Sequence, residues 1–434
     1  MKDIDVTFKN LGLGDALLKT LADEGYDTPT PIQNKAIPPI LKGHDVVGLA
    51  QTGTGKTAAF TLPLLHRMMG EIPAKSPRDV RMLVLSPTRE LAAQIETAVK
   101  TYGRGLGLWS ASVVGGVPVR RHRLALKNGI DILVATPGRL EDLVAQKIIR
   151  LDRVQSVVLD EADQMLDIGF LPAIKRILKL LPKKRQTLLF SATMPKEIKA
   201  LSNDYLSEAV EVSVTPAATT VEKINQSVMH MQPGDKPSAV AKLIKANPGK
   251  RVIIFTRTKR GADKVTRKLN SENLSAEAIH GNKSQNQRTR TLAAFRDGSK
   301  PVLTATDIAA RGIDVPGVEL IVNYDLPHVP ESYVHRIGRT ARAGASGLAV
   351  SFCTADDVKL LRAIERLIRL KIPALMVDGT AIPESAPEVL ETPRPPKHRP
   401  RRRFNRDGDS GDSMAMKPKK SRRRRPRRKP ASAA

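Results

Sequence analysis

The sequence predicts an α/β protein with two domains, each built on a parallel β-sheet that helices cover. Its 434 residues exceed one ordinary domain of about 100 to 200 residues. Short apolar runs alternate with longer segments of helical period, which is typical of βαβ units. Hydrophobic residues make up 41% of the chain but aromatic residues only 3%. The interior is therefore expected to be mainly Val, Ile, Leu and Ala, a mix that suits buried parallel strands.

The candidate strands form two groups of five. The first group comprises Val46–Leu49, Met82–Ser86, Ile132–Ala135, Ser156–Leu159 and Thr187–Phe190. The second comprises Val252–Thr256, Ser275–Ile279, Val302–Ala305, Leu320–Asn323 and Leu348–Phe352. Between the groups, VTPAATTVE has no helical period and indicates a linker. The predicted organisation is domain 1 at residues 1–213, a linker at 214–222, domain 2 at 223–380 and a tail at 381–434.

The tail is rich in Pro, Arg, Lys, Gly and Ser, with little to bury, so it is expected to be disordered. Between Arg394 and Ala434 it carries seventeen Lys and Arg against three Asp, a net charge of +14, which is half of the formal net charge of +28. A polyanion is the predicted partner. Nucleic acid is favoured over a membrane, because the tail has one aromatic residue, Phe404, and no amphipathic apolar face. A merely solubilising tail is the alternative.

The cysteine content and the hydropathy of the chain exclude several kinds of protein. Cys353 is the single cysteine, so an intramolecular disulfide and a cysteine-based metal site are excluded, and a buried core position is expected for it. The N-terminus lacks the apolar segment of a signal peptide, and no apolar stretch is long enough to span a bilayer. We expect a cytoplasmic protein without membrane or disulfide partners.

The first strand runs into a phosphate-binding pattern, AQTGTGKT, which matches a P-loop with Ala50 in place of the usual first Gly. A strand, a Gly-rich loop and a following helix aim backbone N–H groups at a phosphate. Gly53 and Gly55 permit the tight loop, Lys56 is expected to neutralise β- and γ-phosphate charge, and Thr57 to hold Mg²⁺. An ordinary Gly-rich turn is the alternative. The predicted nucleotide-binding residues here are Ala50, Gln51, Thr52, Gly53, Thr54, Gly55, Lys56 and Thr57.

A second apolar strand ends in acidic residues, Asp160-Glu-Ala-Asp163. Asp160 is placed to hold Mg²⁺ through its water shell. Glu161 is the candidate to orient or deprotonate the attacking water. Alone, DEAD is as well explained by an exposed helix start, but the P-loop upstream favours the catalytic interpretation.

These motifs carry a family resemblance. AQTGTGKT, DEAD, SAT at Ser191–Thr193 and HRIGRTAR at His335–Arg342 follow one another as in the DEAD-box RNA helicases, which the chain resembles from about Phe8 to Val377. FTRTKRGAD and AIHGNKSQNQR are most similar to the bacterial RhlE-type branch. The resemblance implies two tandem RecA-like domains that close on ATP and RNA, with local strand separation coupled to ATP hydrolysis. It also implies ribosomal or RNA-decay assemblies as partners.

The resemblance assigns nucleotide roles by position. In the segment GYDTPTPIQ, Gln33 is implied to contact the adenine edge and Tyr26 to stack on the base, with Phe8 as the isolated upstream aromatic. Choice of ATP over GTP would follow, since the exchanged donor and acceptor would leave Gln33 unpaired. Asp314 is implied to contact the ribose.

The second domain is implied to supply two arginines to the γ-phosphate, Arg339 and Arg342. They lie three apart in a segment of helical period, so we expect them to share one helix face. His335 is implied to link the phosphate site to Ser191–Thr193. Ala341 stands where many relatives have Gly, which puts the local backbone fit in question. A solvated basic helix face is the alternative.

The resemblance also implies a track for the RNA backbone. Glycine N–H groups, Thr hydroxyls, arginine forks and helix starts all suit phosphate oxygens. The implied RNA contacts in domain 1 are Pro87, Thr88, Arg89, Gly115, Gly116, Thr136, Pro137, Gly138 and Arg139. Those in domain 2 are Arg257, Gln285, Arg288 and Thr306. Two rival functions stay open: an RNA-clamping or remodelling ATPase with little unwinding, and a basic RNA chaperone with a non-essential ATPase core.

Overall fold

The computed structural model describes residues 7–51, 53–69, 79–214, 224–310, 315, 317–341 and 346–375. Most of the predicted linker and the whole predicted tail at 381–434 lie outside these residues, as do Thr52, Asp314 and Arg342. We call residues 7–214 the N-terminal lobe and residues 224–375 the C-terminal lobe.

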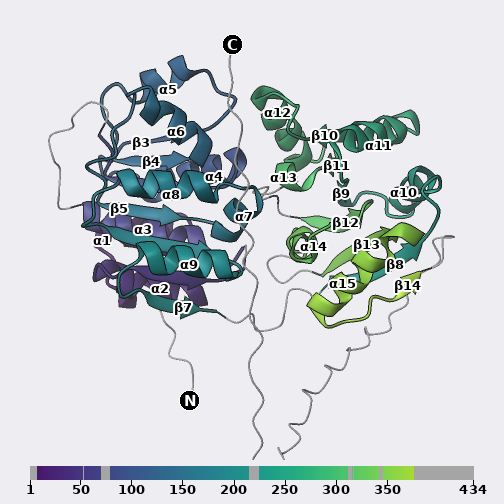
Figure 1. Ribbon diagram of the computed structural model, residues 1–434, viewed down its shortest axis with the longest axis horizontal. Helices are drawn as coiled ribbons and strands as arrows, with labels where there is room; N and C mark the ends of the chain where they lie inside the picture. Colours follow the sequence, from purple (N-terminus) through teal and green to yellow (C-terminus); the bar gives the residue numbers. More distant parts are fainter. Residues whose placement is uncertain are drawn as a thin grey trace, which may run out of the picture. The chain divides into compact units, whose positions relative to one another are not determined.

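The N-terminal lobe has a seven-stranded sheet in the order β3-β4-β2-β5-β6-β1-β7 (Figure 1). Its strands are β1 (Val46–Leu49), β2 (Met82–Leu85), β3 (Ser110–Val113), β4 (Ile132–Ala135), β5 (Ser156–Leu159), β6 (Gln186–Ser191) and β7 (Val210–Ser213). Its helices are η1 (Phe8–Leu11), α1 (Asp15–Asp23), α2 (Pro31–Leu41), α3 (Lys56–Met68), α4 (Arg89–Tyr102), α5 (Val119–Ala125), α6 (Pro137–Ala145), α7 (Ala162–Asp167), α8 (Leu171–Leu180) and α9 (Lys196–Tyr205).

The C-terminal lobe has a second seven-stranded sheet, in the order β10-β11-β9-β12-β13-β8-β14. Its strands are β8 (Ile224–His230), β9 (Arg251–Phe255), β10 (Ala276–Ile279), β11 (Val302–Ala305), β12 (Val318–Asn323), β13 (Gly347–Cys353) and β14 (Ala374–Leu375). Its helices are α10 (Lys236–Lys245), α11 (Lys259–Ser271), α12 (Gln285–Arg296), α13 (Asp307–Ala310), α14 (Pro330–Ile337), η2 (Ala355–Asp357) and α15 (Val358–Ile368).

The two sheets share one topology. Numbered by their order along the chain, the strands of both sheets lie in the order 3-4-2-5-6-1-7, and every pairing is parallel. The prediction of two tandem α/β domains is therefore confirmed. Because the strands are parallel, residues that follow equivalent strands reach equivalent places on each sheet edge, which is where open α/β sheets bind ligands.

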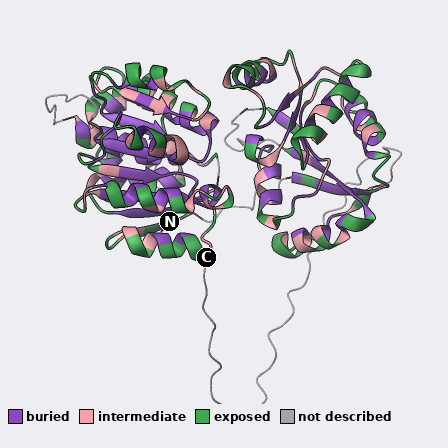
Figure 2. Cartoon of the chain, turned by 45° about the horizontal axis from the view of Figure 1, so that its top comes forward, coloured by how far each residue is buried: buried purple, intermediate pink, exposed green. Residues whose placement is uncertain are grey.

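Each sheet is buried on both faces, as Figure 2 shows in purple. Neighbouring strand residues point to opposite faces, so Val46 and Val47 belong to different apolar clusters, as do Met82 and Leu83. Helices cover both clusters and turn their polar faces outward. Burial on both faces explains why the strands are continuous runs of Val, Ile and Leu without alternation.

A glycine in β1 fixes the packing under the P-loop. A Cβ atom at Gly48 would lie 2.5 Å from two ring atoms of Phe190 on β6. The Phe190 ring packs against Phe60 of α3, with ring centroids 5.4 Å apart. The strand that leads into AQTGTGKT therefore needs a residue without a side chain at this point.

All ten predicted strands are present, with ends that differ by at most two residues. Four strands were missed: β3, β7, β8 and β14. Three are edge strands, and the fourth, β8, carries the polar sequence INQSVMH. Cys353 is buried as expected, and burial raises the pKa of its thiol to about 11. Within the described ranges, no helix has the length and apolar character needed to cross a membrane.

Candidate nucleotide and RNA site

The carboxyl edge of the N-terminal sheet divides into two halves. The nucleotide half comprises the ends of β5, β6 and β1, which are neighbours and lead into DEAD, SAT and AQTGTGKT. The RNA half comprises the ends of β3, β4 and β2, which are also neighbours and lead into Gly115, Thr136 and Pro87. The order of the strands thus places the predicted nucleotide-binding residues of this lobe and its predicted RNA-binding residues on separate halves of the sheet edge.

The P-loop has the backbone that phosphate binding requires. Gly53 and Gly55 have φ angles of 85° and 90°, which L-residues rarely adopt. The Thr54 hydroxyl donates to Gln51 O at 2.7 Å, and Lys56 Nζ donates to Ala50 O at 2.7 Å. The helix predicted to follow the loop is α3, which begins at Lys56. The positive end of a helix therefore faces the loop.

Gln33 lies beside this loop. Its Nε2 donates to Gly55 O at 3.1 Å, while its Oε1 accepts from the Thr30 N–H at 2.9 Å. A Cβ at Gly55 would lie 2.4 Å from Gln33 Nε2, so this contact needs glycine. One amide hydrogen and one lone pair of Gln33 are not used by these two bonds, which is what contact with an adenine edge needs.

The acidic motif is almost fully buried beside Lys56. Asp160 and Glu161 are 2% and 4% exposed, and Glu161 has a φ of 52°. Burial is the main cause that raises the pKa of Asp160 to about 7, with Glu161 adding to the shift and the Lys56 ammonium opposing it. Such an environment favours a bound cation or proton.

Asp163 joins the acidic motif to SAT. Its Oδ2 accepts from the N–H of Ala192 at 3.2 Å and from the N–H and hydroxyl of Thr193, each at 2.9 Å. Its own N–H donates to Ser191 Oγ at 3.2 Å. The resemblance implied that His335 makes the link to SAT, but the sequence analysis did not assign Asp163 this role. The sequence signal for this role was its position shortly after β5, a strand that lies next to β6.

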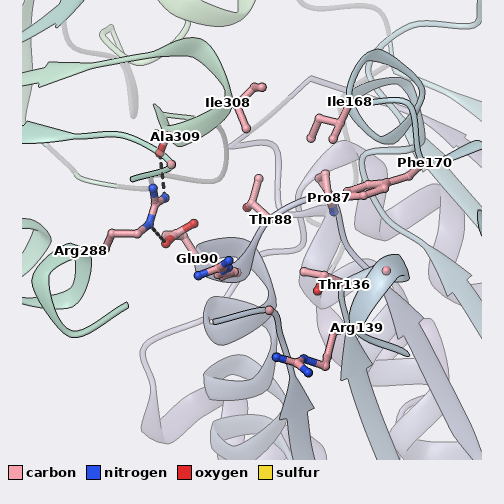
Figure 3. A pocket seen from close by; sticks show the side chains of 14 residues that line it. Pro87, Thr88, Glu90, Thr136, Arg139, Ile168, Phe170, Arg288, Ile308 and Ala309 are labelled. Atoms are coloured by element: carbon pink, nitrogen blue, oxygen red, sulfur yellow. Dashed lines mark hydrogen bonds and ion pairs between the residues drawn. The ribbon is translucent and has the colours of Figure 1, made fainter. Parts of the chain in front are cut away.

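The RNA half surrounds a cavity of about 330 Å³ (Figure 3). Most of the predicted RNA residues of the N-terminal lobe line it. Its lining also includes hydrophobic residues that the sequence analysis missed, among them Ile168, Phe170 and Ile308. They follow no phosphate-binding pattern, and exposure of Ile308 on the short helix α13 is visible only in three dimensions. The lining residues are Pro87, Thr88, Arg89, Glu90, Gly115, Thr136, Gly138, Arg139, Ile168, Phe170, Gly281, Arg288, Ile308 and Ala309.

Arg139 has an internal role that the sequence did not suggest. Its Nε donates to Val114 O at 3.3 Å and its Nη2 to Val117 O at 3.0 Å. These bonds brace the loop that carries Gly115 and Gly116, and Gly116 has a φ of 78°. Arg139 therefore shapes the glycine loop on the cavity wall, whereas its predicted contact with phosphate stays a prediction.

Two residues of α12 also have partners within the protein. Arg288 Nε donates to Glu90 Oε1 at 2.7 Å, and both side chains are buried (Figure 3). Arg288 Nη2 donates to Ala309 O at 3.3 Å, and Arg89 Nη1 donates to Gln285 Oε1 at 3.3 Å. The Arg288 guanidinium thus has a carboxylate partner within the protein, and its contact with RNA stays a prediction.

Arg257, another predicted RNA contact, also has a partner within the protein. Its Nη2 lies 3.0 Å from Asp357 Oδ1, and Asp357 is also 3.8 Å from the buried Lys236 ammonium. The Arg257 side chain is still 41% exposed.

Thr306 lies where β11 ends, and its carbonyl accepts from the N–H groups of Ala309 and Ala310 in α13. It is the counterpart of Thr136 after β4.

The expected shared helix face for Arg339 and Arg342 is wrong. α14 ends at Ile337 with Gly338 as its C-cap, so Arg339 lies beyond the helix. Arg339 is buried, and its Nε donates to His335 O at 3.2 Å. Ala341 has a φ of 55°, a conformation that favours glycine, so this backbone position holds an Ala where the resemblance implied Gly. Arg342 lies outside the described residues.

Phe8 and Tyr26, the two aromatic residues predicted for the nucleotide site, lie in different environments. Phe8 is 4% exposed within the apolar core. Tyr26 packs edge-on against Tyr102, with ring centroids 6.2 Å apart, and lines a cavity that no P-loop residue lines. Phe8 is therefore a core residue and Tyr26 packs beside α4, and the stacking of Tyr26 on adenine stays a prediction.

Comparisons with known proteins agree with this geometry. Residues 30–201 match the family described as DEAD/DEAH box helicase, and residues 235–344 match the helicase conserved C-terminal domain. The chain is 41% identical to ATP-dependent RNA helicase CshA of Limosilactobacillus reuteri, across 84% of this chain and 72% of that protein. It is 44% identical to RNA helicase CrhR of Synechocystis sp., across 84% and 73%.

Two solved structures share the fold. S. cerevisiae Dbp5 bound to RNA and ADP BeF3 matches with a TM-score of 0.76 and 32% identity, covering 86% of this chain and 96% of that one. Mss116p bound to ssRNA and AMP-PNP matches with a TM-score of 0.76 and 31% identity, covering 87% and 80%. Both lobes are therefore RecA-like domains, and the chain belongs to the DEAD-box family of RNA helicases.

Proposed function

We propose that this chain is an RNA-stimulated ATPase that couples ATP binding and hydrolysis to local separation of RNA duplexes. The observation that carries the proposal is the division of one sheet edge into a phosphate-binding half and an RNA half. Ligands bound to the two halves would be separated by two or three strands of the sheet. Neighbouring strands are about 4.8 Å apart. Family membership and the RNA-bound relatives support the same reading.

ATP is proposed to bind the P-loop through the backbone N–H groups of residues 53–57, with Lys56 against its phosphates. The donor set suits Mg²⁺, because Thr57 offers a hydroxyl and Asp160 a carboxylate oxygen, and hard cations prefer oxygen. Within the described part of the chain, no cluster of three or more His, Cys, Asp or Glu forms a metal site, so phosphate and water must supply the other ligands. When bound, Mg²⁺ neutralises phosphate charge.

Glu161 is proposed to accept the proton of the attacking water. Its buried carboxylate sits between Asp160 and the start of α7, directly at the end of β5. Gln33 is proposed to read the adenine edge with its remaining donor and acceptor. Arg339 is proposed to reach the γ-phosphate from the C-terminal lobe; Arg342, Asp314 and His335 are carried over from the resemblance as its helpers.

RNA is proposed to run along the RNA half, held by its phosphates. Glycine N–H groups at Gly115 and Gly116, and the helix starts at Thr88 and Thr136, supply donors without reading sequence. Equivalent places after β9 and β11 of the C-terminal lobe, at Arg257 and Thr306, extend the track. Contacts with 2′-hydroxyls would distinguish RNA from DNA.

Three finer points stay proposals. Cytoplasmic location, ribosomal or RNA-decay partners, and membership of the RhlE-type branch rest on the family resemblance. An ATPase that clamps RNA without unwinding shares every residue named, and only strand displacement separates it. A basic RNA chaperone with a non-essential core is disfavoured because Lys56, Glu161 and Arg339 are all retained.

Steady-state ATP hydrolysis tests the proposal, measured without nucleic acid, with RNA and with single-stranded DNA. Glu161→Gln keeps the size of the side chain but removes the base, so turnover with RNA is expected to fall by about 10² to 10⁴. RNA that fails to stimulate the wild-type protein, or a Gln variant that stays active, would contradict the proposal. A duplex displacement assay then separates unwinding from clamping.

A further inference from the structure

Helix α5 presents three arginines without counter-charges. Its sequence is VRRHRLA, and Arg120, Arg121 and Arg123 are all exposed. None of the three guanidinium groups forms an ion pair or hydrogen bond with any described residue. Lys127, directly after the helix, adds a fourth exposed positive charge. The helix contains no acidic residue, so its outer surface is uniformly positive.

This absence of partners sets α5 apart from the rest of its lobe. Every other described arginine between residues 7 and 214 has an acceptor. The pairs are Arg67–Gln186, Arg81–Asp131, Arg89–Gln285, Arg104–Glu24, Arg139–Asp142, Arg150–Asp152, Arg153–Asp79, Arg176–Glu141 and Arg185–Pro182 O. The lobe does not lack acids for pairing, so the unpaired group on α5 is a local feature.

The helix is fixed to the wall of the RNA cavity. His122, the buried residue among the arginines, donates from Nε2 to Val114 O at 3.2 Å. Burial lowers the pKa of His122. Arg139 holds the same carbonyl and Val117 O. Gly115 lines the cavity, and α5 begins four residues later. The three arginines are therefore held at a set position relative to the RNA half.

We propose that α5 binds the phosphate backbone of RNA that extends beyond the cavity. This inference rests on the proposed function. The helix is about 10 Å long at 1.5 Å per residue, and arginine side chains extend its reach, so its three arginines can contact neighbouring phosphates of one strand. Arginine forks suit phosphate oxygens, and three unpaired arginines lose no internal partner on binding. Backbone contact of this kind adds affinity and salt dependence but no sequence preference.

The test compares RNAs of two lengths on the full chain. A triple variant, R120Q/R121Q/R123Q, is matched by R150Q/R153Q/R176Q, which removes the same charge from exposed arginines that face carboxylates. Fluorescence anisotropy gives the affinity for a single strand of about 8 nucleotides, which fills one binding site, and for a strand of about 25 nucleotides. A third RNA carries its extension as duplex, to show which form α5 holds. All titrations include a non-hydrolysable ATP analogue and a salt series.

The α5 variant is expected to bind an extended RNA about tenfold more weakly, with the salt slope reduced by about 2 for a single-stranded extension, since each lost phosphate contact contributes about 0.7. Affinity for the short RNA should stay within about twofold, and R120K/R121K/R123K should restore most of the loss because it restores charge. An unchanged slope on both extended RNAs, an equal loss on the short RNA, or an equal loss with the control triple would overturn the inference. If the wild-type protein binds none of the RNAs, the proposed function itself fails.

Discussion

The nucleotide half and the RNA half of the N-terminal sheet edge treat charge in opposite ways. In the nucleotide half, Asp160, Glu161 and Asp163 are all buried, with the Lys56 ammonium nearby. In the RNA half, arginines and glycines predominate, and Arg139 donates hydrogen bonds to two backbone carbonyls. The nucleotide half therefore gathers buried negative charge, which opposes folding. The RNA half is held in shape by hydrogen bonds within the protein.

This difference indicates which half depends on a bound ligand for its stability. Buried carboxylates are costly unless a cation or proton neutralises them, so the nucleotide half is expected to gain most from a bound metal–nucleotide complex. The RNA half has its loop geometry in place through protein bonds alone. Ligand-dependent stability should therefore map to residues 56 and 160–163, and RNA affinity to residues 87–89, 115–116 and 136–139.

The largest effect is expected from Lys56→Met. The substitution keeps a similar volume but removes the positive charge that lies near Asp160 and would face the phosphates. ATP turnover with RNA should fall by about 10² to 10³, and the nucleotide-free protein should lose about 2 kcal/mol because carboxylates lose their counter-charge. Steady-state kinetics and urea unfolding measure the two effects. A variant with normal stability would show that Lys56 does not offset the acidic motif.

Asp160→Asn should lose activity but gain stability. Folding raises the pKa of Asp160 from 3.8 to about 7, so ionisation opposes folding. The penalty is absent below pH 3.8, grows as the pH rises toward 7, and is complete above it. The nucleotide-free variant should therefore be more stable by about 1 to 3 kcal/mol at pH 8, and the gain should shrink toward pH 4. Unfolding curves across this pH range decide it; a variant less stable at pH 8 contradicts the account.

Deletion of residues 384–434 tests a region outside both halves. These residues carry the positive charge of the C-terminus and lie outside the described residues. RNA affinity at low salt should fall about tenfold and the salt dependence should flatten, because fewer counterions are released on binding. RNA-saturated ATP turnover should stay close to wild type. Equal salt slopes before and after deletion would show that the tail does not contact RNA.

The smallest effect is expected from Arg139→Gln. The substitution removes the bonds from the guanidinium to Val114 O and Val117 O, so the glycine loop at 115–116 loses its brace. Each bond contributes about 1 kcal/mol to the loop, and since only part of this loss is transmitted to RNA binding, RNA affinity should fall several-fold. Filter binding of a short RNA measures the loss. Arg176→Gln, at an exposed arginine of the N-terminal lobe that pairs with Glu141, serves as the control and should not change RNA affinity.

The central strands were predictable because they are buried on both faces and appear as runs such as MLVL and VVL. Edge strands such as β3 and β14 were not, since one side of each has no partner and the apolar signal is short. The motif positions at strand ends were also predictable, because a parallel sheet gathers its carboxyl ends on one edge.

The partners of individual side chains were not predictable. Arg288 and Arg139 had the right residue type for phosphate, yet each is held by protein acceptors that lie far away in sequence. The helix expected through Arg342 ends at Ile337, because Gly338 caps it. Such details depend on tertiary contacts, and residue type alone cannot distinguish an arginine that binds a ligand from one that supports a loop.

The most direct test of the divided edge is a crossed binding measurement on Lys56→Met and Arg139→Gln. Calorimetry with a non-hydrolysable ATP analogue and Mg²⁺ gives nucleotide affinity, and anisotropy with a short RNA, without nucleotide, gives RNA affinity. We predict that Lys56→Met loses nucleotide affinity but keeps RNA affinity, and that Arg139→Gln does the reverse. If either variant loses both affinities while remaining folded, the two halves of the edge do not act as separate binding sites.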